Sequence, residues 1–235
     1  MHRRSFIKAC ALAAGALAAN PSLALAGGMV PRLYQRVRLV DGKGLALRAS
    51  TLPPAQQLVF HYPYTVTPCF LINLGRPAPG RNGLRTEQGV AYDWQGGVGP
   101  QRSLVAFSAI CAHKLTHPTP AVSHISFRPR RSDHEPEAGI ITCCSENSRY
   151  DPLRGAEVIS GPARQPLAAI ILEHDPRDDG LYAVGTLGGE LFQRFFTEFE
   201  RRLSVQYPNG GAQQLVSGQI PAIPLEQYSA NVLGC

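Results

Sequence analysis

Two short segments of the chain carry thiol and imidazole groups at spacings that suit a metal site. Cys111-Ala112-His113 places a thiol and an imidazole on what must be one tight loop. Farther along, Cys143 and Cys144 stand side by side. Thiolate suits zinc and iron–sulfur clusters, and imidazole suits zinc and iron. The sequence therefore predicts a metal site of mixed softness, formed by two facing loops.

These segments resemble the two cluster-binding loops of Rieske [2Fe–2S] proteins. The stretches "VAFSAICAHKLTH" and "GIITCCSENSRYDP" are similar to the C-x-H and C-x-x-H motifs of that family. The similarity runs from about Phe60 to Ala183. In the family two cysteines hold one iron and two histidines hold the other, which raises the reduction potential. The resemblance therefore implies a [2Fe–2S] cluster with Cys111 and His113 among its ligands.

The second motif departs from the family at its histidine. In the ungapped register, Cys143 takes the cysteine position and Glu146 stands where the family has histidine. If the register is shifted by one residue, Cys144 becomes the ligand and Asn147 stands at the histidine position. Neither register supplies a second histidine.

Two hydroxyls behind the second motif favour the ungapped register. In that register Ser148 and Tyr150 keep the family spacing, and the resemblance implies that they hydrogen-bond a bridging sulfide and a ligand thiolate. Such bonds tune the potential of a cluster. The segment "SGPARQPL" resembles the third loop of the family, so Gly161 and Pro162 are expected to cover the cluster and limit water access.

Three kinds of donor are open for the fourth ligand. Glu146 or Asn147 could supply oxygen, which is a harder donor than imidazole. Cys143 and Cys144 could both bind, although neighbours on an extended backbone point to opposite sides. A histidine of the connection between the motifs could also fold back. The candidates are His117, His124 and His134.

The N-terminus has the pattern of a twin-arginine export signal. Arg3-Arg4 precedes an Ala/Leu-rich run at residues 9–19, and Ala24-Leu25-Ala26 offers a cleavage site of small residues. We expect cleavage after Ala26 and a periplasmic protein, with membrane anchoring only if the segment is retained. Cleavage removes three basic residues and no acid, so the formal charge falls from +6 to +3. A charge this mild gives no reason to invoke nucleic acid as a partner.

The remaining cysteines offer further pairings. Many respiratory Rieske proteins carry an additional cysteine in each cluster loop, and the two are bridged. The resemblance places Thr116 and Ser145 at the corresponding positions, so that bridge is absent. Cys69 lies in an apolar run and is expected to be a buried, inert thiol. Cys235 could be free, pair with Cys69, or link two chains.

The pattern of apolar runs predicts an all-β fold. Runs such as "LVFHYPYTV", "CFLINL" and "GIITC" have strand length and are bounded by Pro or Gly, and Asp41-Gly42 predicts a hairpin turn. The resemblance implies a Rieske-like antiparallel β-sandwich with a small cluster-binding subdomain. We expect a signal peptide, an N-terminal segment, a Rieske-like domain, and a C-terminal helix with a tail. Their bounds are 1–26, 27–58, 59–187 and 188–235.

The C-terminal part contains a different pattern. In "GGELFQRFFTEFERRLSVQY" the apolar residues recur at helical spacing, which predicts one amphipathic helix with an aromatic face. Such a face packs on its own domain or docks on a larger subunit. The connection between the two motifs holds a charged stretch, "RPRRSDHEPE", which we interpret as solvated surface, with docking of a redox partner as the alternative.

These observations predict a periplasmic Rieske-type electron-transfer protein, or the small subunit of an exported oxidoreductase or respiratory complex, rather than an enzyme by itself. Its partner would be a larger oxidoreductase subunit or a cytochrome. One alternative is a structural subunit that keeps the fold without a cluster. Another is a zinc-binding scaffold, because the same thiolates and imidazole suit zinc. A Rieske oxygenase is disfavoured because the chain is too short to include a second, iron-binding domain.

Overall fold

The fold is described by a computed structural model that covers residues 29–129 and 139–235. The export signal expected at residues 1–26 lies outside the described residues. So does most of the charged stretch between the two motifs, including His134.

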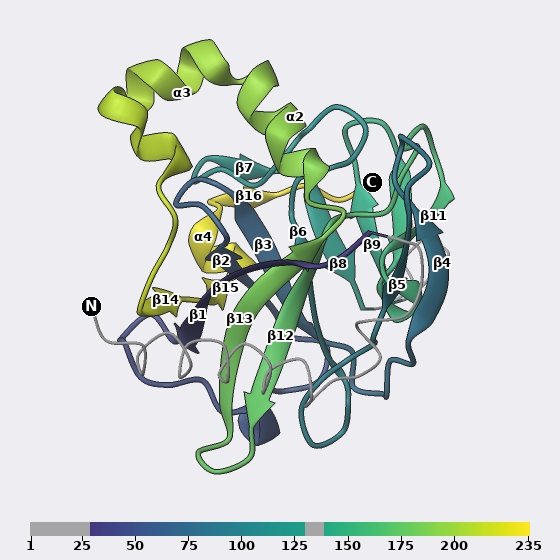
Figure 1. The fold of residues 1–235 in the computed structure, drawn as a ribbon, viewed down its shortest axis with the longest axis vertical. Helices are drawn as coiled ribbons and strands as arrows, with labels where there is room; N and C mark the ends of the chain where they lie inside the picture. Colours follow the sequence, from purple (N-terminus) through teal and green to yellow (C-terminus); the bar gives the residue numbers. More distant parts are fainter. Residues whose placement is uncertain (1–28, 130–138) are drawn as a thin grey trace, which may run out of the picture.

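A sheet of eight strands forms the base of the fold (Figure 1). Its strand order is β14-β1-β13-β12-β6-β3-β2-β15, and its neighbours are antiparallel except for β1 and β14. The strands are β1 (Arg32–Val40), β2 (Gln57–His61), β3 (Pro68–Asn73), β6 (Leu104–Ser108), β12 (Ala169–Asp175), β13 (Gly180–Leu187), β14 (Gln219–Pro221) and β15 (Ile223–Pro224). Only Ala222 separates β14 from β15 in the chain, so the tail brings the two ends of the sheet together and covers edges that would otherwise be open.

A second, smaller sheet lies to one side of the base (Figure 1). Its order is β11-β10-β9-β8, with all neighbours antiparallel. These strands are β8 (Ile125–Arg128), β9 (Ile140–Cys143), β10 (Ser148–Asp151) and β11 (Glu157–Ser160). Beside it lies the hairpin of β4 (Arg81–Arg85) and β5 (Ala91–Trp94). The expected all-β fold is confirmed. The small sheet carries the second motif, whereas the first motif follows β6 of the large sheet.

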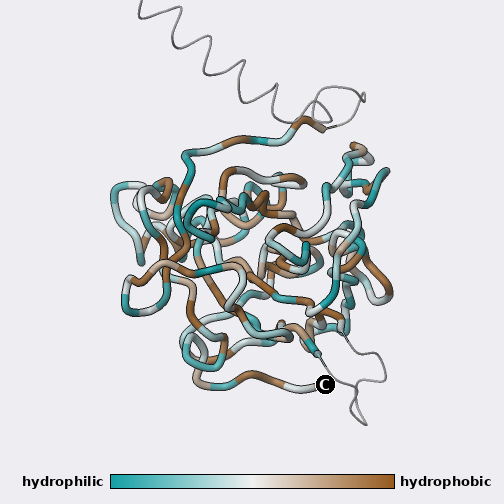
Figure 2. The backbone as a smooth tube through the Cα atoms, turned by 90° about the horizontal axis from the view of Figure 1, so that it is seen from below, coloured by the Kyte–Doolittle hydropathy of each residue, from teal (hydrophilic) through white to brown (hydrophobic). Residues whose placement is uncertain are grey.

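The remaining elements are short. Strands β7 (Val122–Ser123) and β16 (Asn231–Val232) have two residues each and pair in parallel; β16 lies near the end of the chain. Single turns of 3-10 helix span Ala49–Thr51 and Pro152–Arg154, and a longer one spans Pro208–Gln213. A four-residue helix, α4 (Leu225–Tyr228), follows β15. The chain ends at the periphery of the molecule (Figure 2).

The core lies at the middle of the large sheet. Every residue of β3 and of β6 is buried, which explains why these segments read as continuous apolar runs rather than as alternating ones. Cys69 on β3 is fully buried, and its thiol donates to the carbonyl of Tyr62 at 3.1 Å. The expectation of a buried thiol is confirmed, and burial raises the pKa of Cys69, which is in keeping with low reactivity.

The turn at Asp41 forms, and the hairpin predicted around it is short: the N–H of Asp41 donates to the carbonyl of Leu45 at 2.7 Å, and the N–H of Leu47 donates to the carbonyl of Leu39 at 3.1 Å. The Asp41 carboxylate accepts the N–H groups of Lys43 at 2.9 Å and Leu45 at 2.8 Å. Beyond the turn, the returning chain makes one isolated bridge to β1, between Ala46 and Val40. The hairpin stays short because β13 pairs with β1 as far as Arg38 and β14 pairs with Arg38–Val40, so only the end of β1 is left for the returning chain.

The predicted C-terminal helix is divided in two. Helix α2 (Glu190–Glu198) and helix α3 (Glu200–Gln206) meet at Phe199, whose backbone leaves the helical region (φ −102°, ψ 13°). The rings of Phe195 and Phe199 lie 5.1 Å and 5.3 Å from the ring of His117. The aromatic face therefore packs on the chain's own domain. Within the described ranges, no helix has the length and apolarity needed to cross a bilayer.

Truncation of the aromatic face should weaken the whole fold. Phe195 is 2% exposed, and we expect Phe195→Ala to lower the free energy of unfolding by about 3 kcal/mol, the usual cost of removing a buried ring. Val205→Ala on α3 is the control, because Val205 is 80% exposed and its truncation should cost less than about 0.5 kcal/mol. Urea unfolding of both variants checks this. Equal losses would show that the face is not part of the core.

Candidate metal centre

The first loop, residues 109–117, turns back on itself directly after β6. The N–H of Cys111 donates to the carbonyl of Thr116 at 2.8 Å, and the N–H of Leu115 donates to the carbonyl of Cys111 at 2.9 Å. Leu115 adopts a left-handed conformation (φ 57°) to close the turn. As a result Cys111 points inward and is 2% exposed, whereas the His113 side chain keeps 26% of its surface exposed.

The second loop, residues 144–147, joins β9 to β10. Cys143 ends β9 and lies directly opposite Ser148, the first residue of β10. Asn147 adopts a left-handed conformation (φ 56°), which asparagine tolerates better than most residues. The structure therefore gives Asn147 a backbone role in closing this turn.

The two loops meet through their cysteines. The thiol of Cys143 donates a hydrogen bond to Cys111, which lowers the pKa of Cys111 and raises that of Cys143. The Tyr150 hydroxyl lies 3.2 Å from Cys111 Sγ and accepts the N–H of Ala112 at 3.1 Å. Backbone N–H groups of residues 113 and 114 also lower the pKa of Cys111. The pair is thus arranged to hold negative charge on sulfur.

Ser148 offers a buried hydroxyl beside this pair. Residues that face each other across an antiparallel pair project to the same side of the sheet, so Ser148 and Cys143 share one face. The Ser148 hydroxyl is fully buried and has no hydrogen-bond partner within the described chain. An unsatisfied buried hydroxyl costs roughly 1–3 kcal/mol. A sulfide between the loops would supply the missing acceptor, so Ser148 fits an iron–sulfur group.

The outer end of the site is a charged pair. His113 Nδ1 lies 3.2 Å from Glu146 Oε2, and Lys114 Nζ contacts the other carboxylate oxygen. Lys114, and after it His113, lowers the pKa of Glu146. Two ligands of one tetrahedral ion, with bonds of about 2.0–2.1 Å, lie roughly 3.3 Å apart. The spacing of His113 and Glu146 therefore fits two donors to one metal ion.

A third loop, residues 161–168, covers the second. Gly161 has φ +89°, and a Cβ atom there would lie 2.4 Å from the carbonyl oxygen of Asn147 and 2.6 Å from Cα of Ser148. Only glycine permits this approach. Pro162 follows at the exposed surface of the loop. Gly161 therefore lies against the second loop, and the expectation that Gly161 and Pro162 shield a cluster from water stays a prediction.

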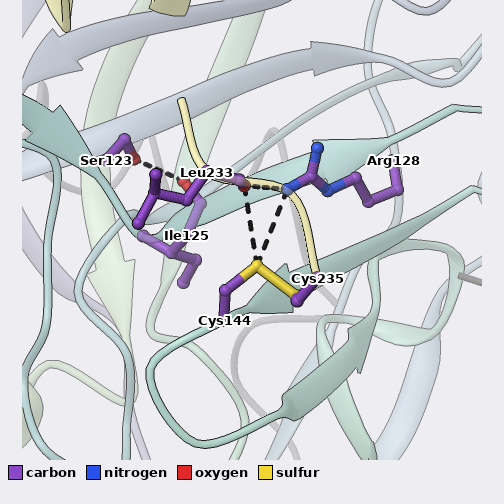
Figure 3. The surroundings of a disulfide bond; sticks show 6 residues. All are labelled: Ser123, Ile125, Arg128, Cys144, Leu233 and Cys235. Atoms are coloured by element: carbon purple, nitrogen blue, oxygen red, sulfur yellow. Dashed lines mark hydrogen bonds between the residues drawn. A yellow bond between two sulfur atoms is a disulfide. The ribbon is translucent and has the colours of Figure 1, made fainter. Parts of the chain in front are cut away.

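Cys144 faces away from the site and forms a disulfide with Cys235 (Figure 3). Their Cα atoms are 5.4 Å apart, and the bond joins residues separated by 91 positions. The guanidinium of Arg128 donates to the carbonyl of Leu233 beside it. A sulfur in a disulfide is not a thiolate ligand. Two of the expected ligand sets are therefore wrong, because both used Cys144: the set from the shifted register and the set with three cysteines. Adjacent residues on an extended backbone point to opposite sides, which is the reason.

Two further histidines, His117 and His61, have other partners, whereas His124 accepts the N–H of Cys144 with its backbone carbonyl and stays a candidate ligand. His117 Nδ1 lies 2.8 Å from the carbonyl of Leu115, and its ring packs between two aromatic rings of the C-terminal helices. His61 Nε2 lies 3.1 Å from the Tyr228 hydroxyl. Nowhere in residues 29–129 or 139–235 do three or more His, Cys, Asp or Glu side chains gather at a single point. The donors instead form two pairs, Cys111 with Cys143 and His113 with Glu146.

Comparison with known proteins identifies the family of the chain. The chain is 32% identical to the iodate reductase subunit IdrB of Denitromonas iodatirespirans over 194 residues, which cover 80% of this chain and 82% of IdrB. The chain belongs to the Rieske protein family. Among solved structures, it is similar to the soluble domain of the Rieske protein II (SoxF) from Sulfolobus acidocaldarius, with 27% identity, a TM-score of 0.47, and coverage of 65% of this chain and 78% of that domain. No family model matches the chain.

Two features of this Rieske site were not foreseen from the sequence. The pairing of Cys144 with Cys235 had one usable signal: with Cys111 and Cys143 assigned to the site and Cys69 to the core, these two cysteines remained. The role of Lys114 had no signal in the sequence, because its contact with Glu146 depends on how the two loops meet.

Removal of the disulfide should destabilise the second loop and the tail together. We expect Cys235→Ser to lower the free energy of unfolding by about 2–5 kcal/mol, because a cross-link that closes a long loop restricts the unfolded chain. Thermal unfolding with and without a phosphine reductant checks this. Reductant should lower the melting temperature of the native protein and leave that of the variant unchanged. Equal sensitivity of both proteins would contradict the assigned pairing.

Proposed function

We propose that this chain is an exported electron-transfer subunit that holds a [2Fe–2S] cluster between its first and second loops. Membership of the Rieske family supports this proposal, and one observation carries it. A hydrogen-bonded cysteine pair and an unsatisfied serine hydroxyl are buried together at the inner end of the site, while a His–Glu pair lies at its outer end.

In this proposal Cys111 and Cys143 hold the inner iron, and His113 and Glu146 hold the outer one. A bound cluster would supply one-electron transfer. The arrangement of the donors in two pairs favours a two-iron group over zinc, because a structural zinc ion takes four donors at a single point. Glu146 is preferred to Asn147 as the fourth ligand because its carboxylate already lies against His113.

The surrounding residues would keep the inner end dry and stabilise its charge. The Tyr150 hydroxyl and the N–H groups after Cys111 stabilise negative charge on that sulfur. Ser148 would donate to a sulfide, and hydrogen bonds to sulfur raise the potential of a cluster. His113 is half-exposed and would be the point of approach for a redox partner.

The partner follows from the relative. IdrB is named as a subunit of iodate reductase, and we propose that this chain likewise exchanges electrons with a larger oxidoreductase subunit or a cytochrome, which performs the turnover. The Arg3-Arg4 segment supports twin-arginine export to the periplasm. A disulfide at Cys144 is in keeping with an oxidising compartment.

The first test is the iron and acid-labile sulfide content of protein exported by a twin-arginine-competent host, together with low-temperature EPR. We expect about two irons and two sulfides per chain and a rhombic signal on reduction, as for a Rieske-type cluster. Zinc at one ion per chain would support the zinc scaffold instead. Protein prepared anaerobically without iron, sulfide or zinc would support a structural subunit that keeps the fold alone.

The identity of the fourth ligand is tested by restoring the family residue. Glu146→His removes a negative charge from the outer iron, so the reduction potential should rise toward that of ordinary Rieske clusters. The control is Glu198→Gln, which removes a charge from an exposed position of α2 in the same groove as His113. Redox titration followed by EPR measures both. A potential that Glu146→His and Glu198→Gln shift equally would show that Glu146 acts as a nearby charge and not as a ligand.

A further inference from the structure

One arginine from outside the sequence motifs holds the first loop. Arg194, on α2, reaches the two carbonyl groups that flank the metal-binding histidine position. Its Nη1 donates to the carbonyl of Ala112 at 3.2 Å, and its Nη2 donates to the carbonyl of His113 at 3.3 Å. The guanidinium thus hydrogen-bonds two successive peptide groups within the Cys-x-His segment.

The same guanidinium also contacts the carboxylate of Glu87. Arg194 Nη1 lies 2.8 Å from Glu87 Oε2, and Arg164 Nη1 approaches the other carboxylate oxygen at 3.6 Å. The backbone N–H of Glu87 donates to Gln165 Oε1 at 2.8 Å, and Gln165 is 2% exposed in the third loop. Arg194 therefore links α2, the turn between β4 and β5, and the third loop to the first loop.

The geometry requires an arginine. A guanidinium carries five N–H donors in a rigid plane, so one side chain can serve two adjacent carbonyls and a carboxylate together. A lysine has a compact ammonium group on a flexible stem and would keep the charge but lose the fixed fork. The helix is well placed to hold it, because the buried residues Leu191 and Phe195 fix α2 against the core on either side of Arg194.

We propose that Arg194 is a positioning residue, which fixes the backbone of the first loop and thereby the placement of His113 at the outer iron. The part that concerns the cluster potential rests on the proposed function, whereas the part that concerns the order of the loop does not. Arg194 also brings a positive charge to the loop, and positive charge near a cluster favours its reduced state.

The order of the loop is tested on the full chain by hydrogen exchange, which needs no cluster. In Arg194→Gln, the amides of residues 109–116 should exchange on the order of tenfold faster, as expected when charge-assisted hydrogen bonds are lost, while those of β12 stay unchanged. Arg194→Lys should restore part of the protection. The control is Arg201→Gln, at an exposed position of α3, which should leave the loop unchanged. Unchanged exchange in Arg194→Gln would overturn the proposal.

The effect on the cluster is measured as the reduction potential and the EPR g-values. Arg194→Gln should shift the potential to a more negative value and broaden the signal, and Arg194→Lys should retain the potential more closely. Glu87→Gln leaves the arginine in place but removes the carboxylate that holds it. It should change the hydrogen-exchange rates and the g-values in the same direction as Arg194→Gln. This variant replaces Arg194→Gln in the test if Arg194→Gln does not fold. Native potential and g-values in both Arg194→Gln and Glu87→Gln would overturn the link to His113. Absence of iron in every protein would instead refute the proposed function, and hydrogen exchange would still decide the role of Arg194.

Discussion

The contact between Cys111 and Cys143 is the interaction on which the rest of the site depends. Cys111 follows a strand of the large sheet and Cys143 ends a strand of the small one, so their hydrogen bond joins the two layers at one point. Tyr150 reinforces the contact because its hydroxyl reaches both Cys111 Sγ and the N–H of Ala112. Negative charge on a buried sulfur is costly without such donors. The position of each loop is therefore tied to that of the other.

The polarity of the site changes along its length. Its inner end is sulfur, phenol and hydroxyl, all buried, and its outer end is the half-exposed group of His113, Lys114 and Glu146. A carboxylate is a harder and more negative donor than imidazole. Where other Rieske proteins place two neutral imidazoles, this chain pairs one imidazole with an anion and sets a lysine beside it. The lysine offsets part of the negative charge of Glu146.

The tail has a larger structural role than its composition suggests. Its strands β14 and β15 occupy the two ends of the large sheet, and β16 pairs with β7. Its last residue is bonded to Cys144 in the second loop. Many Rieske proteins brace their two cluster loops by a bridge between them, which Thr116 and Ser145 preclude here. In this chain the second loop is braced from outside by the C-terminus, and the first loop by Arg194 from α2.

The sequence by itself determined the strands, the two cysteine-bearing loops and the aromatic helix face, because periodicity and turn residues act over a few neighbours. It also located the departure at Glu146. Tertiary structure alone decided that Cys144 faces Cys235, that Arg194 reaches the first loop, and that pairing of β1 with β13 and β14 limits the hairpin at Asp41 to a few residues. These outcomes depend on contacts between segments far apart in the chain. Local pattern does not encode such contacts, because packing of whole sheets and helices sets them.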